Sequence, residues 1–390
     1  MGKKDPVSLD LLFYRNHFME KIKMVDLHTQ YLRIKEEIDL AIQKVLTSTA
    51  FIQGAEVHQF AADLGRYVKA ENVIPCANGT DALQIAMMAL DLQPGDEVIL
   101  PVHTYVATAE VIALLRLKPV FVDVDEDTFN IDINQIQNKI SRKTKAIVPV
   151  HLYGQCADME PILNTAEEYG LHVIEDAAQA LGATYRFEDG TTEGAGTMGI
   201  IGTTSFFPSK NLGCYGDGGA IFTKDSQVAE KVKMIANHGQ KVKYHHDLIG
   251  VNSRLDTLQA AILSVKLKYL AEYERKRNEV AAYYDKSLPK ALLQTPFRSV
   301  NSSHVFHQYT CKVLGRDRDE LQRFLSSHGI PTMIYYPVPL HMQKAYQSKK
   351  HGAGSFPVTE KLSKTVISLP IHTEMTVEDL ALICETIKKF

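Results

Sequence analysis

One lysine has a setting in the sequence that favours chemistry. Lys210 follows an apolar segment, residues 203–207, and precedes a glycine-rich stretch, residues 216–219. A lysine after a buried strand can be partly desolvated, which lowers the pKa of its amine and makes it a nucleophile that forms a Schiff base. The glycines allow the backbone to pass close to a ligand. Taken alone the segment is weak evidence, because most loop lysines are solvated surface residues.

Two acidic residues end another apolar segment. Glu175 and Asp176 follow residues 172–174, which predict a buried strand. A carboxylate at the end of a strand can keep a pyridinium nitrogen protonated, and the ring then acts as an electron sink. The alternative is that the acid only caps the helix that follows.

A third segment has the composition of a phosphate site. Asn78, Gly79 and Thr80 precede an apolar helix predicted at residues 80–90. The free amides and the dipole of a helix start bind phosphate well. The alternative is an ordinary N-cap by Thr80.

An aromatic residue lies after a further strand. Residues 97–100 predict a strand, and Tyr105 lies in the segment that follows it, where its ring could stack on a flat cofactor. His103 lies beside it but has no second ligand at a metal-binding spacing, so the sequence predicts no metal site.

The elements that position these residues alternate in type, which predicts an α/β fold. Mostly parallel strands are then flanked by helices, and ligands bind at the carboxyl ends of the strands. The predicted strands are residues 97–100, 119–124, 146–150, 172–175, 203–207 and 220–223. The predicted helices are residues 80–90, 108–115, 159–169 and 227–236, followed by a long helical stretch at 255–288.

The C-terminal part of the sequence has a different texture. A strand is predicted at 307–313, helices at 316–328 and 376–388, and a proline-rich loop at 335–339. We therefore predict an N-terminal extension (residues 1–23), a large domain (24–284) and a small α+β domain (285–390).

Composition excludes several classes of protein. The formal net charge is −3, which gives no broad attraction to nucleic acid or membranes. No segment approaches the roughly 20 apolar residues that span a bilayer. The five scattered cysteines form no CxxC pair and indicate a reduced, cytoplasmic chain.

Taken together, the order and spacing of these motifs resemble the DegT/DnrJ/EryC1/StrS sugar aminotransferases, which are fold-type I enzymes dependent on pyridoxal 5′-phosphate (PLP). The resemblance runs from about residue 24 to the C-terminus. It is greatest to members that act on UDP-2-acetamido-2-deoxy-3-oxo-glucuronate. The matching stretches are residues 76–88, 148–158, 203–223, 238–246 and 250–263.

The resemblance implies a role for each site residue. Lys210 matches the lysine that binds PLP covalently, and Asp176 matches the acid on the pyridine nitrogen. The other implied cofactor contacts are Gln179 near the 3-hydroxyl, Tyr105 stacked on the ring, Gly79, Thr80 and Ser205 on the phosphate, and Asn252 on the phosphate from a neighbouring subunit. Arg254 and Tyr335 are the implied substrate contacts.

The implied reaction transfers an amino group from glutamate to a keto sugar-nucleotide, for surface polysaccharide or lipopolysaccharide synthesis, in a homodimer with shared active sites. Many relatives have His-Tyr-Pro where this chain has Tyr335-Tyr336-Pro337, so the sugar stays open, including a 4-keto sugar on dTDP or UDP. A sugar dehydratase of the same fold is an alternative, but those enzymes have histidine in place of the lysine, so Lys210 argues against it. A non-enzymatic regulator and an aminotransferase for free amino acids are the remaining alternatives.

Overall fold

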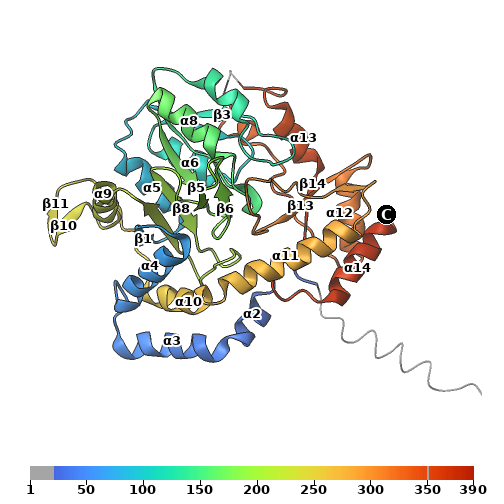
Figure 1. Cartoon of the computed structure of the whole chain (residues 1–390), viewed down its shortest axis with the longest axis horizontal. Helices are drawn as coiled ribbons and strands as arrows, with labels where there is room; N and C mark the ends of the chain where they lie inside the picture. Colours follow the sequence, from blue (N-terminus) through green and yellow to red (C-terminus); the bar gives the residue numbers. More distant parts are fainter. Residues whose placement is uncertain (1–21, 349–350) are drawn as a thin grey trace, which may run out of the picture.

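A seven-stranded sheet forms the centre of the molecule, in a computed structural model that describes residues 22–348 and 351–390 (Figure 1). Six strands run parallel to one another, and only β9 runs in the opposite direction. The α/β fold expected from the sequence is therefore confirmed. In spatial order the strands are β1 (Asn72–Cys76), β9 (Gly219–Thr223), β8 (Ile201–Ser205), β5 (His172–Asp176), β4 (Thr144–Ile147), β2 (Glu97–Pro101) and β3 (Lys118–Val122).

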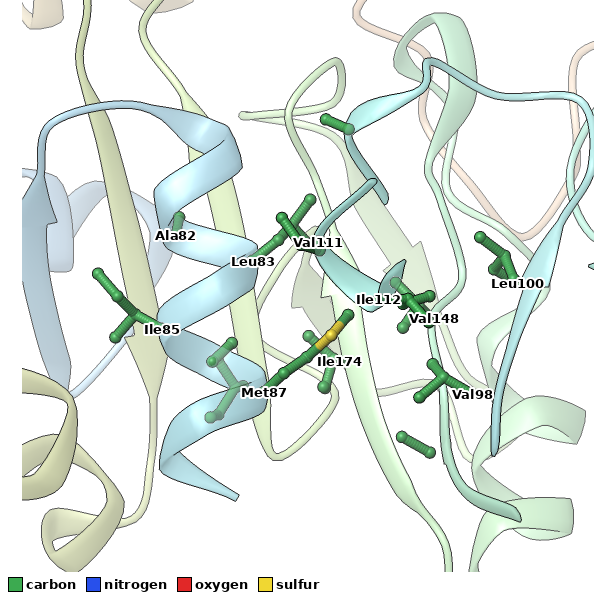
Figure 2. Close-up of a cluster of buried hydrophobic side chains, with 14 of the residues drawn as sticks. Ala82, Leu83, Ile85, Met87, Val98, Leu100, Val111, Ile112, Val148 and Ile174 are labelled. Atoms are coloured by element: carbon green, nitrogen blue, oxygen red, sulfur yellow. The ribbon is translucent and has the colours of Figure 1, made fainter. Parts of the chain in front are cut away.

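Both faces of this sheet are buried, because successive side chains of a strand point to opposite faces. In β2, Val98 and Leu100 pack into one core while Ile99 packs into another. Figure 2 shows the first core between the sheet and two helices, where Met87 approaches Ile174 and Leu83 approaches Val111. Apolar burial on both faces explains why the strands read as nearly continuous apolar runs.

Helices cover each face. On the face of Val98 lie α5 (Gly79–Ala89), α6 (Ala107–Leu114) and α9 (Ser226–Ala236). The opposite face packs against α4 (Ala55–Val68), α8 (Met159–Tyr169) and α10 (Thr257–Leu267). The first described helices, α2 (Leu27–Arg33) and α3 (Lys35–Ser48), precede α4, and α3 packs on α10.

A second, smaller sheet has its own core. It consists of β12 (Leu293–Gln294), β13 (Tyr309–Val313) and β14 (Val366–Leu369), all antiparallel. Its core includes α12 (Arg318–Ser327), α14 (Val377–Lys388) and the end of α11 (Leu270–Ser287), which runs from α10 toward this sheet (Figure 1). The domain boundary at residue 285 stays a prediction, and residues 1–21 of the expected extension lie outside the described residues.

The remaining elements are short. They are the hairpins β6 (Thr184–Arg186) with β7 (Thr192–Gly194) and β10 (Gln240–Val242) with β11 (His245–His246), the helices α7 (Ile133–Ile136) and α13 (Pro357–Thr365), and the 3-10 turns η1 (Gln137–Lys139), η2 (Leu152–Gly154) and η3 (Leu340–Met342).

The long helical stretch predicted at residues 255–288 consists of two helices. The chain forms α10 and α11 with a break at Lys268 and Tyr269. Lys268 pairs with Glu37 of α3 at 2.9 Å, and the Tyr269 hydroxyl binds the same carboxylate. Tertiary contacts fix this break, since neither glycine nor proline marks it.

The prediction missed the strands β1, β12 and β14 of the two larger sheets, as well as the four strands of the short hairpins. β1 contains Pro75, which lacks an amide donor and therefore argues against a strand. The structure accommodates Pro75 because β1 is an edge strand, paired on one side only with β9. Several other predicted strands end two or three residues too late, at 124, 150 and 207.

Candidate active site

A cavity of about 740 Å³ lies at the carboxyl ends of the central strands. β5 ends at Asp176 and β8 ends at Ser205, and both residues line the cavity, as does the start of α5. The predicted site residues that line it are Gly79, Thr80, Tyr105, Asp176, Gln179, Ser205, Lys210 and Tyr335. Segments more than 200 residues apart in sequence therefore meet where the parallel sheet predicts a ligand site.

Lys210 extends into this cavity from the segment that joins β8 to β9. Its side chain is partly exposed, and its amide donates to the Phe207 carbonyl at 2.8 Å. Burial of the amine lowers the pKa of Lys210 to about 8, against the opposing effect of the nearby Asp176 carboxylate. A larger fraction of the amine is therefore neutral, and nucleophilic, near neutral pH than for a solvated lysine.

Asp176 is held in a fixed orientation. It is buried, and its Oδ2 accepts a hydrogen bond from the Thr108 hydroxyl at 2.8 Å. Its Oδ1 accepts from the Ala178 amide at 3.1 Å. Asp176 organises a turn rather than capping a helix, and it also faces the cavity, so its role on a pyridinium nitrogen stays a prediction.

The start of α5 forms another wall of the cavity. Asn78 is the N-cap, since its Oδ1 accepts from the Asp81 amide at 2.8 Å, so the alternative of an N-cap by Thr80 was wrong. A Cβ atom on Gly79 would lie 2.7 Å from Cβ of Ser205, so glycine permits the close approach of helix and strand. The first amides of a helix have no acceptor within the helix and can bind an anion.

Aromatic and amide side chains form the remaining wall. Gln179 accepts from the Tyr153 amide at 2.8 Å through Oε1 and donates through Nε2 to the Tyr336 hydroxyl at 3.2 Å. Tyr105 is exposed to the cavity, with its ring centroid 6.1 Å from that of Tyr336. The Tyr153 hydroxyl bonds the Tyr335 carbonyl, which ties the loop after α12 to the cavity.

Sequence reasoning missed several residues of this site. Thr108, which holds Asp176, lies at the start of the helix predicted after β2, and a hydroxyl at that helix start is the signal that could have found it. His307 and Gln308, which precede β13 of the second sheet, also line the cavity. Burial and the charge of Lys210 lower the pKa of His307. No local pattern in the sequence marks these two residues.

Two predicted residues lie elsewhere. Arg254 lines a separate cavity of about 720 Å³ and donates to Oδ1 of Asn237 at 3.2 Å. Asn252 is exposed and forms an isolated bridge with Asn237. Neither residue therefore reaches the Lys210 cavity of its own chain.

The model of the DegT/DnrJ/EryC1/StrS aminotransferase family matches residues 32–388. The chain belongs to this family. A UDP-2-acetamido-2-deoxy-3-oxo-D-glucuronate aminotransferase from Pseudomonas aeruginosa is 48% identical over 93% of this chain and 98% of its own. A protein from Geobacillus stearothermophilus named a pleiotropic regulatory protein is 47% identical over 95% of this chain and 98% of its own. A dTDP-3-amino-3,4,6-trideoxy-alpha-D-glucose transaminase from Streptomyces venezuelae is 39% identical over 90% and 91%.

Solved structures of family members have the same fold. A DegT/DnrJ/EryC1/StrS aminotransferase from Brucella abortus superposes with a TM-score of 0.89, at 39% identity over 95% of this chain and 99% of its own. A Bacillus subtilis structure with bound cofactor PMP, the amino form of PLP, has a TM-score of 0.86 at 32% identity over 100% and 89%. The fold-type I architecture is thereby confirmed.

The site of this aminotransferase fits such a cofactor. The buried Thr104 hydroxyl and Nδ1 of His307 have no partner among the described residues, and both residues line the cavity. The start of α5 offers neutral donors for a phosphate, and Asp176 offers an anion for a ring nitrogen. Across the described part of the chain, no three His, Cys, Asp or Glu side chains gather as metal ligands, and no helix is long and apolar enough to cross a membrane.

Proposed function

We propose that this aminotransferase uses PLP bound at Lys210 to transfer an amino group from glutamate to a 3-oxo sugar carried on a nucleotide. One observation carries the proposal: a lysine with a lowered pKa, a fixed carboxylate and a helix start share one cavity. When bound, PLP supplies an electron sink for the carbanion formed at Cα of the amino donor.

Each residue then has a distinct task. Gly79, Thr80 and Ser205 hold the phosphate, Asp176 keeps the pyridine nitrogen protonated, and Tyr105 covers the ring. The carbonyl oxygen of Gln179 is occupied by the Tyr153 amide, so its amide nitrogen, which donates to the Tyr336 hydroxyl, would be the group that contacts the 3-hydroxyl of the cofactor.

Lys210 has two tasks. With PLP present, its amine would hold the cofactor covalently in the resting enzyme. As a free amine it would take the proton from Cα of the donor and pass it to the cofactor, and in the second half it would move a proton from the cofactor to the sugar carbon. A pKa near 8 suits both directions of this transfer.

Two relatives support the sugar class. The Pseudomonas enzyme acts on a 3-oxo sugar, and the Streptomyces enzyme is named for a 3-amino sugar. Their nucleotides differ, UDP in one and dTDP in the other. We take UDP-2-acetamido-2-deoxy-3-oxo-glucuronate as the first candidate, in a cytoplasmic enzyme of surface polysaccharide or lipopolysaccharide synthesis. All five thiols are free and buried, which agrees with a reducing compartment.

A turnover assay with a panel of sugars tests this assignment. Purified protein with PLP and glutamate is offered UDP- and dTDP-linked 3-oxo and 4-oxo sugars, and the amino sugars are read by mass spectrometry. The expected result is product from a UDP-linked 3-oxo sugar. Product from the 4-oxo sugars only would contradict the assignment of the ring position, and no product from any sugar would favour the regulatory role named for the Geobacillus relative.

We further propose a homodimer in which Asn252 and Arg254 complete the cavity of the partner. The position of both residues outside the Lys210 cavity of their own chain supports this arrangement. Mixing inactive Lys210→Ala and Asn252→Ala protomers should restore about a quarter of the parental activity, since half of the dimers then contain one intact site. If mixing restores nothing although mass spectrometry detects mixed dimers, the sites are not shared.

A further inference from the structure

A buried lysine on α10 contacts the segment that presents Lys210. Lys266 is only 1% exposed, and its Nζ donates to the Gly213 carbonyl at 2.5 Å. The same ammonium group lies 5.2 Å from the ring centroid of Tyr215. Both contacts fall between Lys210 and β9, so the cation of α10 binds the turn that follows the reactive lysine.

A second residue of α10 holds the same turn. Gln259 accepts from the Tyr215 amide at 2.9 Å and donates to the Tyr215 carbonyl at 3.3 Å. Lys266 and Gln259 thus fix consecutive parts of the backbone on one side of the turn. The turn has little freedom to shift while α10 stays in place.

The position of this turn determines that of Lys210, because backbone hydrogen bonds close the turn tightly. The Cys214 amide donates to the Phe206 carbonyl at 2.8 Å, and the Lys210 amide donates to the Phe207 carbonyl at 2.8 Å. A Cβ atom on Gly213 would lie 2.3 Å from the Pro208 carbonyl oxygen, so Gly213 packs directly against the backbone that precedes Lys210. A displacement of Gly213 would therefore move the segment that carries the reactive amine.

Burying the ammonium group of Lys266 costs free energy, and the need to fill space in the core does not explain why a cation is placed there. Burial lowers the pKa of Lys266 to about 8 against the opposing effect of Cys214, and the charge of Arg277 contributes a smaller part of the lowering. Within residues 22–348 and 351–390, no carboxylate forms an ion pair with Lys266. A buried ammonium with neutral partners is unfavourable, and an apolar side chain of similar length would fill the space without this penalty.

We propose that Lys266 is a positioning residue that fixes the turn at Gly213 and thereby the orientation of Lys210. The inference rests on the proposed function, in which Lys210 binds PLP. A residue that serves only the fold should stabilise it, whereas Lys266 fixes the reactive segment at the expense of stability.

Replacing Lys266 with methionine separates the two roles. Lys266→Met keeps the length of the side chain and removes the hydrogen bond to Gly213. We expect PLP capture by the apo-protein, followed by absorbance, and kcat to fall about tenfold through misplacement of the amine, with KM for both substrates unchanged. The midpoint of thermal unfolding of the apo-protein should stay the same or rise. Lys268→Met is the matched control, because Lys268 is an exposed residue near the same end of α10.

The outcomes are distinguishable. Unchanged capture and kcat, or a loss of both in proportion to a lowered unfolding midpoint, would overturn the positioning role. If Lys266→Met does not fold, Gln259→Met removes the neighbouring contact to the turn and should give the same pattern, and parental rates in that variant would overturn the proposal. If the parent itself captures no PLP on Lys210, the proposed function fails before Lys266 is tested.

Discussion

Lys210 and Lys266 are shielded from bulk water in different ways. Burial lowers the pKa of each to about 8. Lys210 opens onto a cavity of about 740 Å³ near the Asp176 carboxylate, whereas Lys266 is enclosed and donates a hydrogen bond to a backbone carbonyl. A lowered pKa therefore does not identify a reactive lysine by itself. Access to a ligand and a partner carboxylate make the difference.

The largest effect should come from removing the accessible lysine. Lys210→Ala should abolish amino transfer, by at least about 1,000-fold, because the amine is both the attachment point and the acid–base group. Activity is measured with the sugar panel, and Lys268→Ala serves as the control for loss of a surface lysine. Substantial turnover in Lys210→Ala would show that the reactive amine is elsewhere.

Removing the carboxylate should have the next largest effect. Asp176→Asn should still bind PLP and lose about 100-fold in kcat, because the neutral amide no longer keeps the ring nitrogen protonated. Binding is measured by absorbance and kcat by turnover, with the exposed Asp189→Asn as control. A parental kcat in Asp176→Asn would show that this carboxylate is not what distinguishes Lys210 from Lys266.

A smaller effect should follow from loosening that carboxylate. Thr108→Val removes the hydroxyl that donates to Asp176 Oδ2 at 2.8 Å, and kcat should fall about tenfold. Thr108→Ser keeps the hydroxyl and should retain most of the activity. If the valine and serine variants behave alike, the hydrogen bond to Asp176 has no part in catalysis.

The last effect is on stability rather than on rate, and it concerns the enclosed lysine. The folded pKa of Lys266, about 8, lies below the ordinary value of 10.5, so the unfolded chain binds more protons between these pH values. Stability of the parent should therefore rise from pH 8 to 10.5 relative to Lys266→Met, by up to about 3 kcal/mol. Denaturant unfolding at pH 7, 8.5 and 10 measures this difference, and a constant difference would show that the fold does not lower the pKa of Lys266.

Much of the site could be predicted from the sequence because its residues lie at the ends of apolar strands. Asp176 ends β5, Ser205 ends β8 and Gly79 begins α5, so the sheet alone brings them together. The type of fold followed from the same alternation of strands and helices. The cavity brings together eight of the residues implied by the family resemblance, while Asn252 and Arg254 lie outside it, and all the chemical roles remain predictions.

The rest depended on contacts between distant segments. His307 reaches the cavity only because the second sheet packs beside the first, and no periodicity around it marks a ligand site. The break between α10 and α11 depends on Glu37, more than 200 residues away. In the sequence, Lys266 is only one charge within the helical stretch predicted at 255–288. The packing of α10 against the β8–β9 segment shows that this residue is buried.

Chemical mapping of the PLP attachment site tests the central claim most directly. The PLP-loaded protein is reduced with sodium borohydride, digested and analysed by peptide mass spectrometry. The account predicts a single reduced pyridoxyl adduct on the peptide that contains Lys210, and none on the peptide that contains Lys266. An adduct on another lysine, or no adduct at all, would contradict it.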